Sequence, residues 1–255
     1  MKNNNNDLWF TVKAKKSNKQ YNVKKLFSPG RDRVYFGNGK THFPAIGNTL
    51  AGNTTYDGSI SENVVNGFKD HGIELVGTCP CNCDGCYAKK GTRYVSVAIA
   101  YILNTLELKA DPMRYWSMVG NDIEKHLKKI FKKGGIVRVN DSGDLYSLEN
   151  VIAFEKNIIE RFPFIIFYGY TENHAFADYL NKHENVVFWK SRFTTSGSGN
   201  GYTYVDERKD NRIMDMIHCP SIDKNGKRTG KKCNECLICT KKELLKKLSL
   251  AFMKH

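Results

Sequence analysis

Short apolar runs alternate with amphipathic stretches through the middle of this chain, and this alternation constrains the fold more than any other sequence feature. The runs of strand length are residues 73–76, 136–139, 164–168 and 186–189. The stretches with helical spacing of apolar residues are 93–108, 115–133, 147–161 and 173–181. Strands that alternate with helices are typical of a parallel sheet built from strand-helix-strand units. The sequence therefore predicts an α/β fold.

Two of these helices carry further signals in the sequence. The stretch 115–133 places Trp116, Val119, Ile123, Leu127 and Ile130 on one face, as a helix packed on a sheet would. Ser147 is suited to cap the next helix, and Pro163 ends it soon after residue 161.

The chain divides into three parts, although its 255 residues at 40% hydrophobic composition favour one substantial core. Residues 1–70 are polar and rich in turn formers, which predicts an irregular N-terminal extension with strand-like pieces at 8–12 and 34–36. Residues 71–215 are expected to form the (β/α) core. Residues 216–255 carry a four-cysteine segment and a basic tail, where Leu244, Leu245, Leu248 and Phe252 share one face of an expected amphipathic surface helix.

Four of the eight cysteines lie between residues 79 and 86. Cys79, Cys83 and Cys86 are spaced C-x3-C-x2-C, and thiolates this close in sequence can ligate one inorganic core from a single loop. They are poorly placed to pair with one another in structural disulfides. The spacing predicts an iron-sulfur cluster with three cysteine ligands and one open iron. Because the loop follows the run 73–76, we expect it at the carboxyl end of the first core strand.

Cys81 has no place among three ligands. It is either a fourth ligand, which would close the cluster, or a bystander thiol. Only Pro80 separates it from Cys79, and two ligands so close would be crowded on adjacent irons. This crowding favours the bystander.

A second group of cysteines lies near the C-terminus, with the spacing C-x13-C-x2-C-x2-C. Its members are Cys219, Cys233, Cys236 and Cys239. Four thiolates suit a closed site, either a structural zinc ion or a second [4Fe-4S] cluster. The spacing fits both, and the cluster predicted at the first group favours iron-sulfur at the second.

A polar turn, Asn140-Asp-Ser-Gly-Asp144, follows the apolar run 136–139. The carboxyl ends of parallel strands open on one edge of a sheet, so a ligand at the cysteine loop would reach Gly143 and Asp144. The segment 167–171, which closes the third strand, would line the same cavity. The alternative is a tight strand-to-helix turn whose aspartate caps the next helix.

The net charge of +14 and the pI near 9.3 raise the question of an acidic partner, and nucleic acid is the first candidate. Lysine is scattered as well as clustered, so solvated surface accounts for much of the charge. The first residues lack the apolar run of a signal peptide, and no stretch has the length of a membrane span. We therefore expect a cytoplasmic protein without a membrane partner, in which clustered cysteines act as metal ligands.

The cysteine loop after one strand and the glycine-acid turn after the next resemble a radical S-adenosylmethionine (SAM) fold. The resemblance implies a partial or complete (β/α) barrel in which Cys79, Cys83 and Cys86 hold a [4Fe-4S] cluster. It also implies that SAM chelates the open iron, and that Ser142, Gly143 and Asp144 lie against the SAM amino group. Tyr87, an aromatic residue that follows the third cysteine, is expected beside the cofactor.

Five segments together resemble the phage gene product 88 family over about residues 70 to 240. They are Thr78-Cys-Pro, Cys86-Tyr-Ala88, Val137 to Asp144, Tyr168-Gly-Tyr-Thr171 and the closing cysteine group. The resemblances imply an iron-sulfur protein that cleaves SAM to start radical chemistry on a substrate that the sequence does not identify. The alternative is a non-catalytic iron-sulfur protein of phage type that acts in redox sensing or nucleic-acid binding.

Overall fold

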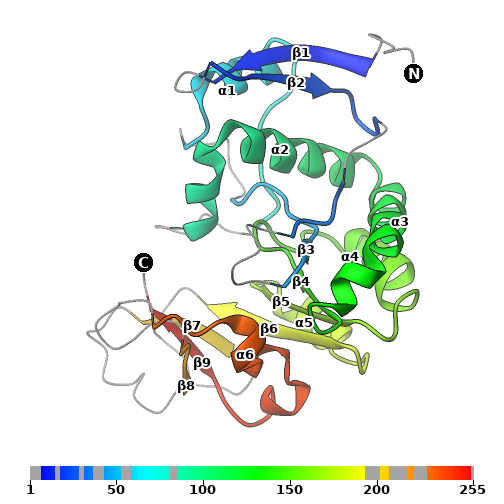
Figure 1. Ribbon diagram of the computed structural model, residues 1–255, viewed down its shortest axis with the longest axis vertical. Coiled ribbons are helices and arrows are strands. Elements are labelled where there is room, and N and C mark those ends of the chain that lie inside the picture. Colours follow the sequence, from blue (N-terminus) through cyan, green and yellow to red (C-terminus); the bar gives the residue numbers. More distant parts are fainter. Residues whose placement is uncertain are drawn as a thin grey trace.

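A parallel sheet forms the centre of the computed structural model (Figure 1). The structure describes residues 7–14, 18–28, 32–36, 43–52, 59–80, 86–192, 202–206, 217–220 and 229–253. Within these residues the sheet has the strand order β3-β4-β5-β6-β7-β9-β8, and all neighbouring strands are parallel. The strands are β3 (Ala45–Ile46), β4 (Ile136–Val139), β5 (Ile166–Thr171), β6 (Val186–Arg192), β7 (Tyr202–Asp206), β8 (Ile217–His218) and β9 (Leu250–Met253).

One face of this sheet is covered by helices that lie on the right in Figure 1. They are α3 (Pro112–Phe131), α4 (Leu148–Phe154) and α5 (His174–Leu180), and α4 continues as a π-helical turn over Glu155–Ile159. Ser147 caps α4 by accepting a hydrogen bond from the Asn150 amide, as predicted. Because side chains alternate across a strand, every second residue faces these helices, and Val137, Phe167 and Phe188 are fully buried there.

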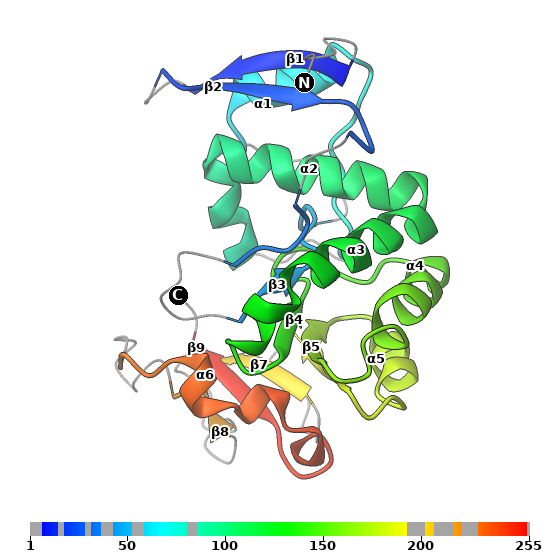
Figure 2. The same cartoon turned by 45° about the vertical axis from the view of Figure 1, so that its right-hand side comes forward.

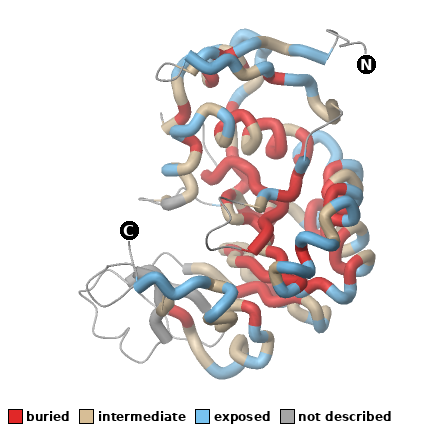
Figure 3. Tube along the Cα trace, in the orientation of Figure 1, coloured by how far each residue is buried: buried red, intermediate tan, exposed pale blue. Residues whose placement is uncertain are grey.

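The second face of the sheet is covered by the C-terminal segment (Figure 2). The alternate residues of the same strands, among them Ile136, Tyr168 and Trp189, pack there with apolar side chains from residues 237–248. The sheet is therefore buried on both sides, as parallel sheets usually are, and the buried residues concentrate along it and on the helices (Figure 3).

The N-terminal region is not the irregular extension that its polar composition predicted. Strands β1 (Leu8–Lys13) and β2 (Gln20–Lys24) form an antiparallel hairpin, which packs with α1 (Glu62–Lys69) on α2 (Val95–Ala110). Val12 and Val23 supply the buried side of the hairpin, so a few inward-pointing residues were enough to form a second core. The same region also contributes β3, whose two residues are too short to produce a periodic pattern.

The prediction of a first core strand over residues 73–76 is also wrong, because this segment forms no strand of the sheet. The place beside β4 is taken by β3, which pairs Ile46 with Val139. The other side of β4 is taken by β5. Leu75 is buried instead in the N-terminal core, which accounts for the apolar run.

The expected amphipathic helix over 241–255 is replaced by a short 3-10 turn, Lys242–Leu244, and by β9. Leu244, Leu245 and Leu248 still pack against the sheet, so the apolar spacing reports burial correctly. The residues after them gain hydrogen bonds from β7 and β8, and this pairing overrides the helical pattern.

The predicted α/β class is thus confirmed, with an open parallel sheet in the part of the chain that the structure describes. A closed barrel is not seen among those strands, whose order ends at β3 and β8. No helix among the described residues has both the length and the apolar character needed to cross a bilayer.

A buried charge cluster ties the N-terminal segment to α2 and α3. The Arg33 guanidinium donates to Glu107 Oε2 at 2.9 Å, and the Arg33 amide donates to Asp122 Oδ2 at 3.1 Å. Glu107 also accepts a hydrogen bond from the Phe27 amide at 3.1 Å. All three charged residues are at most 7% exposed, so each charge depends on the others for its solvation.

Replacing Arg33 with Met should therefore lower the free energy of unfolding by about 3 to 5 kcal/mol, because the buried Glu107 loses the guanidinium and Asp122 keeps only the exposed Lys125 as a cation. Urea unfolding followed by circular dichroism measures the change. The matched control is Lys125→Met, which removes the exposed partner of Asp122 and should leave stability nearly unchanged. Equal stability of Arg33→Met and the parent chain would contradict the role given to the cluster.

Candidate functional site

Polar loops after β3 and β4 meet at the carboxyl edge of the sheet. The Thr49 amide donates to the Ser142 carbonyl at 3.0 Å, and the Ser142 hydroxyl donates to the Thr49 carbonyl at 2.7 Å. The Asp141 amide donates to Asn48 Oδ1 at 2.8 Å. These reciprocal bonds satisfy backbone groups that the strands leave unpaired beyond their ends.

The first cysteine segment joins the same edge. The Thr78 and Cys79 amides donate to the carbonyls of Leu50 and Gly52 at 3.0 and 3.3 Å. The Thr78 hydroxyl lies 2.7 Å from that of Thr49 and accepts the Asp144 amide at 2.9 Å. Cys79 therefore lies at the carboxyl edge of the sheet as expected, but the residues before it are attached to the loop after β3 and do not extend a strand of their own.

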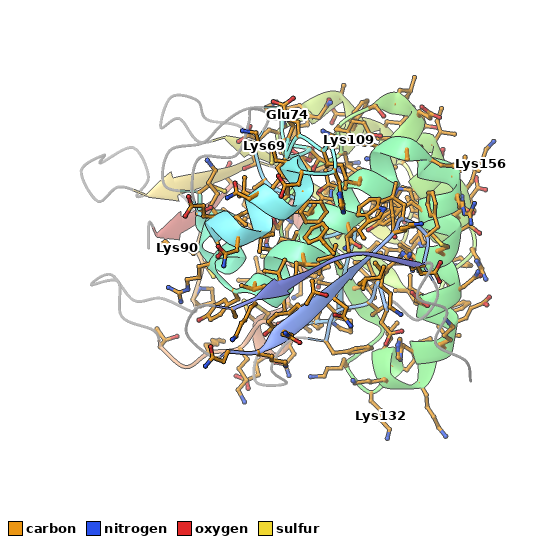
Figure 4. All side chains as sticks on the ribbon, turned by 90° about the horizontal axis from the view of Figure 1, so that it is seen from above. Lys69, Glu74, Lys90, Lys109, Lys132 and Lys156 are labelled. Carbon is orange, nitrogen blue, oxygen red and sulfur yellow. The ribbon has the colours of Figure 1, made fainter. Side chains whose placement is uncertain are left out.

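Lys109 on α2 holds the start of this segment. Its ammonium group donates to the Val76 and Gly77 carbonyls at 3.0 and 2.9 Å, and partial burial lowers the pKa of Lys109. Figure 4 shows Lys109 on the same side of the molecule as Glu74 and Lys69. The lysine thus fixes the backbone just before Cys79.

The remaining residues of the first group are described in part. Cys79 and Cys86 are half-buried, and Cys86 precedes a 3-10 helix over Tyr87–Arg93. Cys81 and Cys83 lie outside the described residues, as does the side chain of Tyr87. The expected ligation by Cys83 and the expected contact of Tyr87 with a cofactor therefore stay predictions.

Gly143 is the point where these loops come closest. Its φ is +81°, a region that favours glycine, and a Cβ atom there would lie 1.8 Å from Thr49 Oγ1 and 2.6 Å from Thr78 Oγ1. The glycine thus allows two protein segments to approach one another. In the sequence-based prediction the same freedom served the approach of SAM.

Asp144 is buried, with 4% of its surface exposed, and its carboxylate links the turn after β4 to the end of β5. It accepts hydrogen bonds from the Leu145 amide at 2.6 Å and the Glu172 amide at 2.9 Å, and from the Thr171 hydroxyl. Burial nevertheless raises the pKa of Asp144 to about 7, because it penalises the charged form more than these bonds favour it. The cap of α4 is Ser147, so the alternative in which Asp144 caps that helix is not the arrangement seen.

The C-terminal cysteines lie on the second face of the sheet. Cys233 and Cys236 bound α6 (Cys233–Cys236), and Cys239 follows in a 3-10 turn after Leu237, whose φ is +57°. Neighbouring thiols raise the pKa of two of them: Cys219 and Cys236 act on both Cys233 and Cys239, and Cys233 acts on Cys239 as well. Burial is the larger cause in both, and it raises the pKa of Cys239 to about 12.

Aromatic side chains of the sheet anchor Cys239. The Trp189 indole donates to the Cys239 carbonyl at 2.9 Å, and the Tyr170 hydroxyl is hydrogen-bonded to the Cys239 thiol. Arg138, 5.5 Å from the ring centroid of Tyr170, pairs with Asp141 at 2.8 Å. Through these contacts, Tyr170 and Arg138 connect the C-terminal cysteines to the turn after β4.

Among the residues that the structure describes, no three histidine, cysteine, aspartate or glutamate side chains are arranged to hold a metal ion. The second group has the right number of thiols in one neighbourhood, without the closed arrangement of a ligated metal. The first group lacks Cys83 from the described residues.

Several residues of this region were not identified from the sequence. Thr49, Thr78, Lys109 and Trp189 belong to four different segments, and of these only Thr78 stands in a segment that carries the family resemblance, Thr78-Cys-Pro. The only usable signal was Thr78, which directly precedes the first cysteine. Their roles come from tertiary contacts between loops that are distant in the chain.

The site thus belongs to an α/β protein with an open parallel sheet, polar loops at its carboxyl edge and cysteines on two sides of one turn. The family model described as Gene product 88 matches residues 38–242. The chain therefore belongs to the gene product 88 family, the phage family expected from the sequence. No curated protein and no solved structure gives a significant match to it.

The contact around Gly143 predicts a large effect of a small substitution. Gly143→Ala should lose about 1 to 3 kcal/mol more stability than Gly230→Ala, because only the first variant also overpacks its surroundings. Both glycines have a φ of +81°, and a Cβ at Gly230 would meet nothing within 4 Å. Thermal and urea unfolding of the two variants give the comparison. Equal losses would show that the space around Gly143 adjusts freely.

The raised pKa of Asp144 predicts a pH-dependent stability. Between about pH 4 and pH 7 the folded chain keeps the proton that the unfolded chain has lost, so stability falls as the pH rises through this window. From about pH 5 to pH 8 the loss due to Asp144 should be about 2 to 3 kcal/mol. Asp144→Asn, which does not titrate, should show a smaller fall in urea unfolding over the same range. Parallel curves for the two proteins would contradict the raised pKa.

Proposed function

We propose that this chain is an iron-sulfur protein of radical SAM type, with a [4Fe-4S] cluster held by Cys79, Cys83 and Cys86. The observation that carries the proposal is the attachment of Cys79 at the carboxyl edge of a parallel sheet, next to the turn after β4. Ligand sites of α/β folds are usually built at this edge. In this proposal the sheet belongs to a partial (β/α) barrel.

The residues fit a cluster through the chemistry of their donors. Cys79 and Cys86 are half-buried thiols, and hydrogen bonds to Leu50 and Gly52 fix the backbone at Cys79. A [4Fe-4S] cluster with three thiolate ligands supplies an open iron to which a small chelating molecule such as SAM can bind. The protein's part is to hold the loop, which Lys109 and Thr78 do from two sides.

The C-terminal cysteines support a second metal site in this proposal, either zinc or a second [4Fe-4S] cluster. Cys219, Cys233, Cys236 and Cys239 supply four thiols, the number that either closed site requires. Tyr170 and Trp189 hold Cys239 against the sheet and would keep this ligand in place.

A second candidate is a non-catalytic iron-sulfur protein of redox or nucleic-acid-binding function, and a specific observation favours it. Both carboxylate oxygens of Asp144 already accept backbone amides, and Thr49 and Thr78 fill the space beside Gly143. In this candidate the Ser142-Gly143-Asp144 turn joins the loops of the protein and does not contact SAM. The two candidates share the cluster and differ in the ligand at its open iron.

A matched pair of cysteine variants tests the cluster. After anaerobic purification, Cys83→Ala should lose the iron and sulfide of the first site and keep the metal of the second, whereas Cys81→Ala should keep both. Iron, sulfide and zinc analyses measure the outcome, and circular dichroism checks that each variant is folded. Zinc in place of iron in the parent chain would contradict both cluster assignments. Loss of iron in Cys81→Ala would make Cys81 a ligand.

The SAM step is tested separately on the parent chain. Electron paramagnetic resonance of the reduced protein should change when SAM is added if SAM binds the open iron, and 5'-deoxyadenosine should form under reducing conditions. A cluster whose spectrum is unaltered by SAM, with no 5'-deoxyadenosine formed, would leave the non-catalytic candidate. The outcome separates SAM chemistry from cluster binding, because the iron and sulfide contents are known from the preceding experiment.

A further inference from the structure

An exposed aromatic patch lies at the amino edge of the sheet, where β4 and β5 begin. Phe131 ends α3 and is 50% exposed, and Phe164 precedes β5 and is 55% exposed. Their rings are stacked, with centroids 5.8 Å apart and an interplanar angle of 29°. Ile166, 36% exposed, extends the patch along β5. We call Phe131, Phe164 and Ile166 together the aromatic patch, after its two rings.

The backbone beside the patch is built to turn tightly. Gly134 and Gly135 have φ values of +93° and +68°, which lead the chain from α3 directly into β4. A Cβ at Gly135 would touch the Phe131 ring at 3.4 Å, and the Gly135 carbonyl accepts the Ile166 amide at 2.9 Å. The two glycines thus bring the end of the helix, with its aromatic ring, against the start of β5.

A cationic rim accompanies the rings. Lys128 is exposed on the last turn of α3, three residues before Phe131 and so its neighbour on the helix surface, and the exposed Lys132 directly follows Phe131 as the residue that caps the helix. Figure 4 places Lys132 at the opposite side of the molecule from Lys69. The two acids of this half of the helix are engaged elsewhere: Asp122 with Arg33 and Lys125, and Glu124 with Arg161.

We infer that the aromatic patch and its lysines form a binding surface for single-stranded nucleic acid. Flat apolar rings accept the faces of unpaired bases, and lysines alongside them neutralise the phosphates, the combination by which single strands are bound without sequence preference. Double-stranded nucleic acid is disfavoured as a partner, because its bases are already stacked on one another inside the duplex. The net charge of +14 attracts the same partner, whereas a second copy of the chain would bring lysines against lysines.

This surface is independent of the cysteine sites, since it lies at the amino edge of the sheet and they adjoin the carboxyl edge. It gives the nucleic-acid alternative a location without depending on a cluster. Its test therefore uses the full chain and reads binding, while iron and sulfide contents are followed as a separate property that the patch variants should leave unchanged.

The test is fluorescence anisotropy with labelled DNA and RNA single strands of about 16 nucleotides, the upper end of the usual site size. The double variant Phe131→Leu/Phe164→Leu keeps apolar contact and removes the rings, and it should weaken binding by at least about 10-fold. The double variant Lys128→Gln/Lys132→Gln should reduce the slope of log K against log salt by about 1.4, or about 0.7 for each phosphate contact. The matched control, Lys24→Gln/Lys69→Gln, removes the same charge from β2 and α1 and should keep the slope.

Three results would overturn the inference. They are the absence of single-strand binding by the folded parent chain, equal binding by the Leu variant, and tighter binding of duplex than of single strand. Sedimentation of the parent chain tests for a fourth result that would overturn the inference, a dimer formed through the patch. A dimer that dissociates in Phe131→Ala/Phe164→Ala would assign the patch to a second copy of the chain.

Discussion

The close approach of three loops at Gly143 is the constraint on which the rest of the candidate site depends. Two threonine hydroxyls, from Thr49 and Thr78, occupy the volume that any other side chain at this position would need. The contact holds the turn after β4, the loop after β3 and the first cysteine segment in one hydrogen-bonded unit. Gly143, a residue without a functional group, therefore helps to position Cys79, together with Lys109 and the bond from the Cys79 amide to the Gly52 carbonyl.

Asp144 extends this unit to the next strand. Its carboxylate receives amides from both its own turn and the end of β5, so the turn is fixed to two strands at once. The cost is a buried acid with a raised pKa. The same turn continues to Asp141, which pairs with Arg138 on the second face of the sheet, near Cys233. One short turn thus lies between the two cysteine groups and contacts the surroundings of both.

The sequence predicted the elements with strong periodicity and failed where tertiary pairing decided the outcome. Strands β4 to β6 and helices α2 to α5 follow the predicted runs closely, because each buries a continuous apolar face. Residues 73–76 share the composition of a strand, but β3 and β5 occupy the two places beside β4. The tail after residue 241 shows helical spacing, yet β7 and β8 offer it backbone partners. Neither outcome is encoded in a local pattern.

For the site, ligation by the cysteines stays a prediction from their spacing. Cys79 does lie at the expected edge, although the strand over 73–76 from which this was predicted is absent from the sheet. The contacts of Gly143 and Asp144 could not be predicted, since they depend on Thr49 and Thr78, which are distant from this turn in the chain and whose contacts no local pattern encodes. A motif reports residue types, and the same glycine and acid serve equally well to bind a ligand or to join two loops. In this chain the hydrogen-bond donors to Asp144 and the atoms that crowd Gly143 belong to the protein.

The distinction between ligand contact and loop joining also separates the two halves of the proposed function. A cluster requires only that Cys79, Cys83 and Cys86 be held in one loop, and the contacts of Thr78 and Lys109 serve that purpose whatever binds the fourth iron. SAM binding requires in addition a group that recognises its ammonium, and Asp144 already has three donors. A carboxylate can accept about four hydrogen bonds, so one further donor completes its capacity. A ligand that reaches Asp144 would therefore have to approach in the single direction that Leu145, Glu172 and Thr171 leave, or displace one of them.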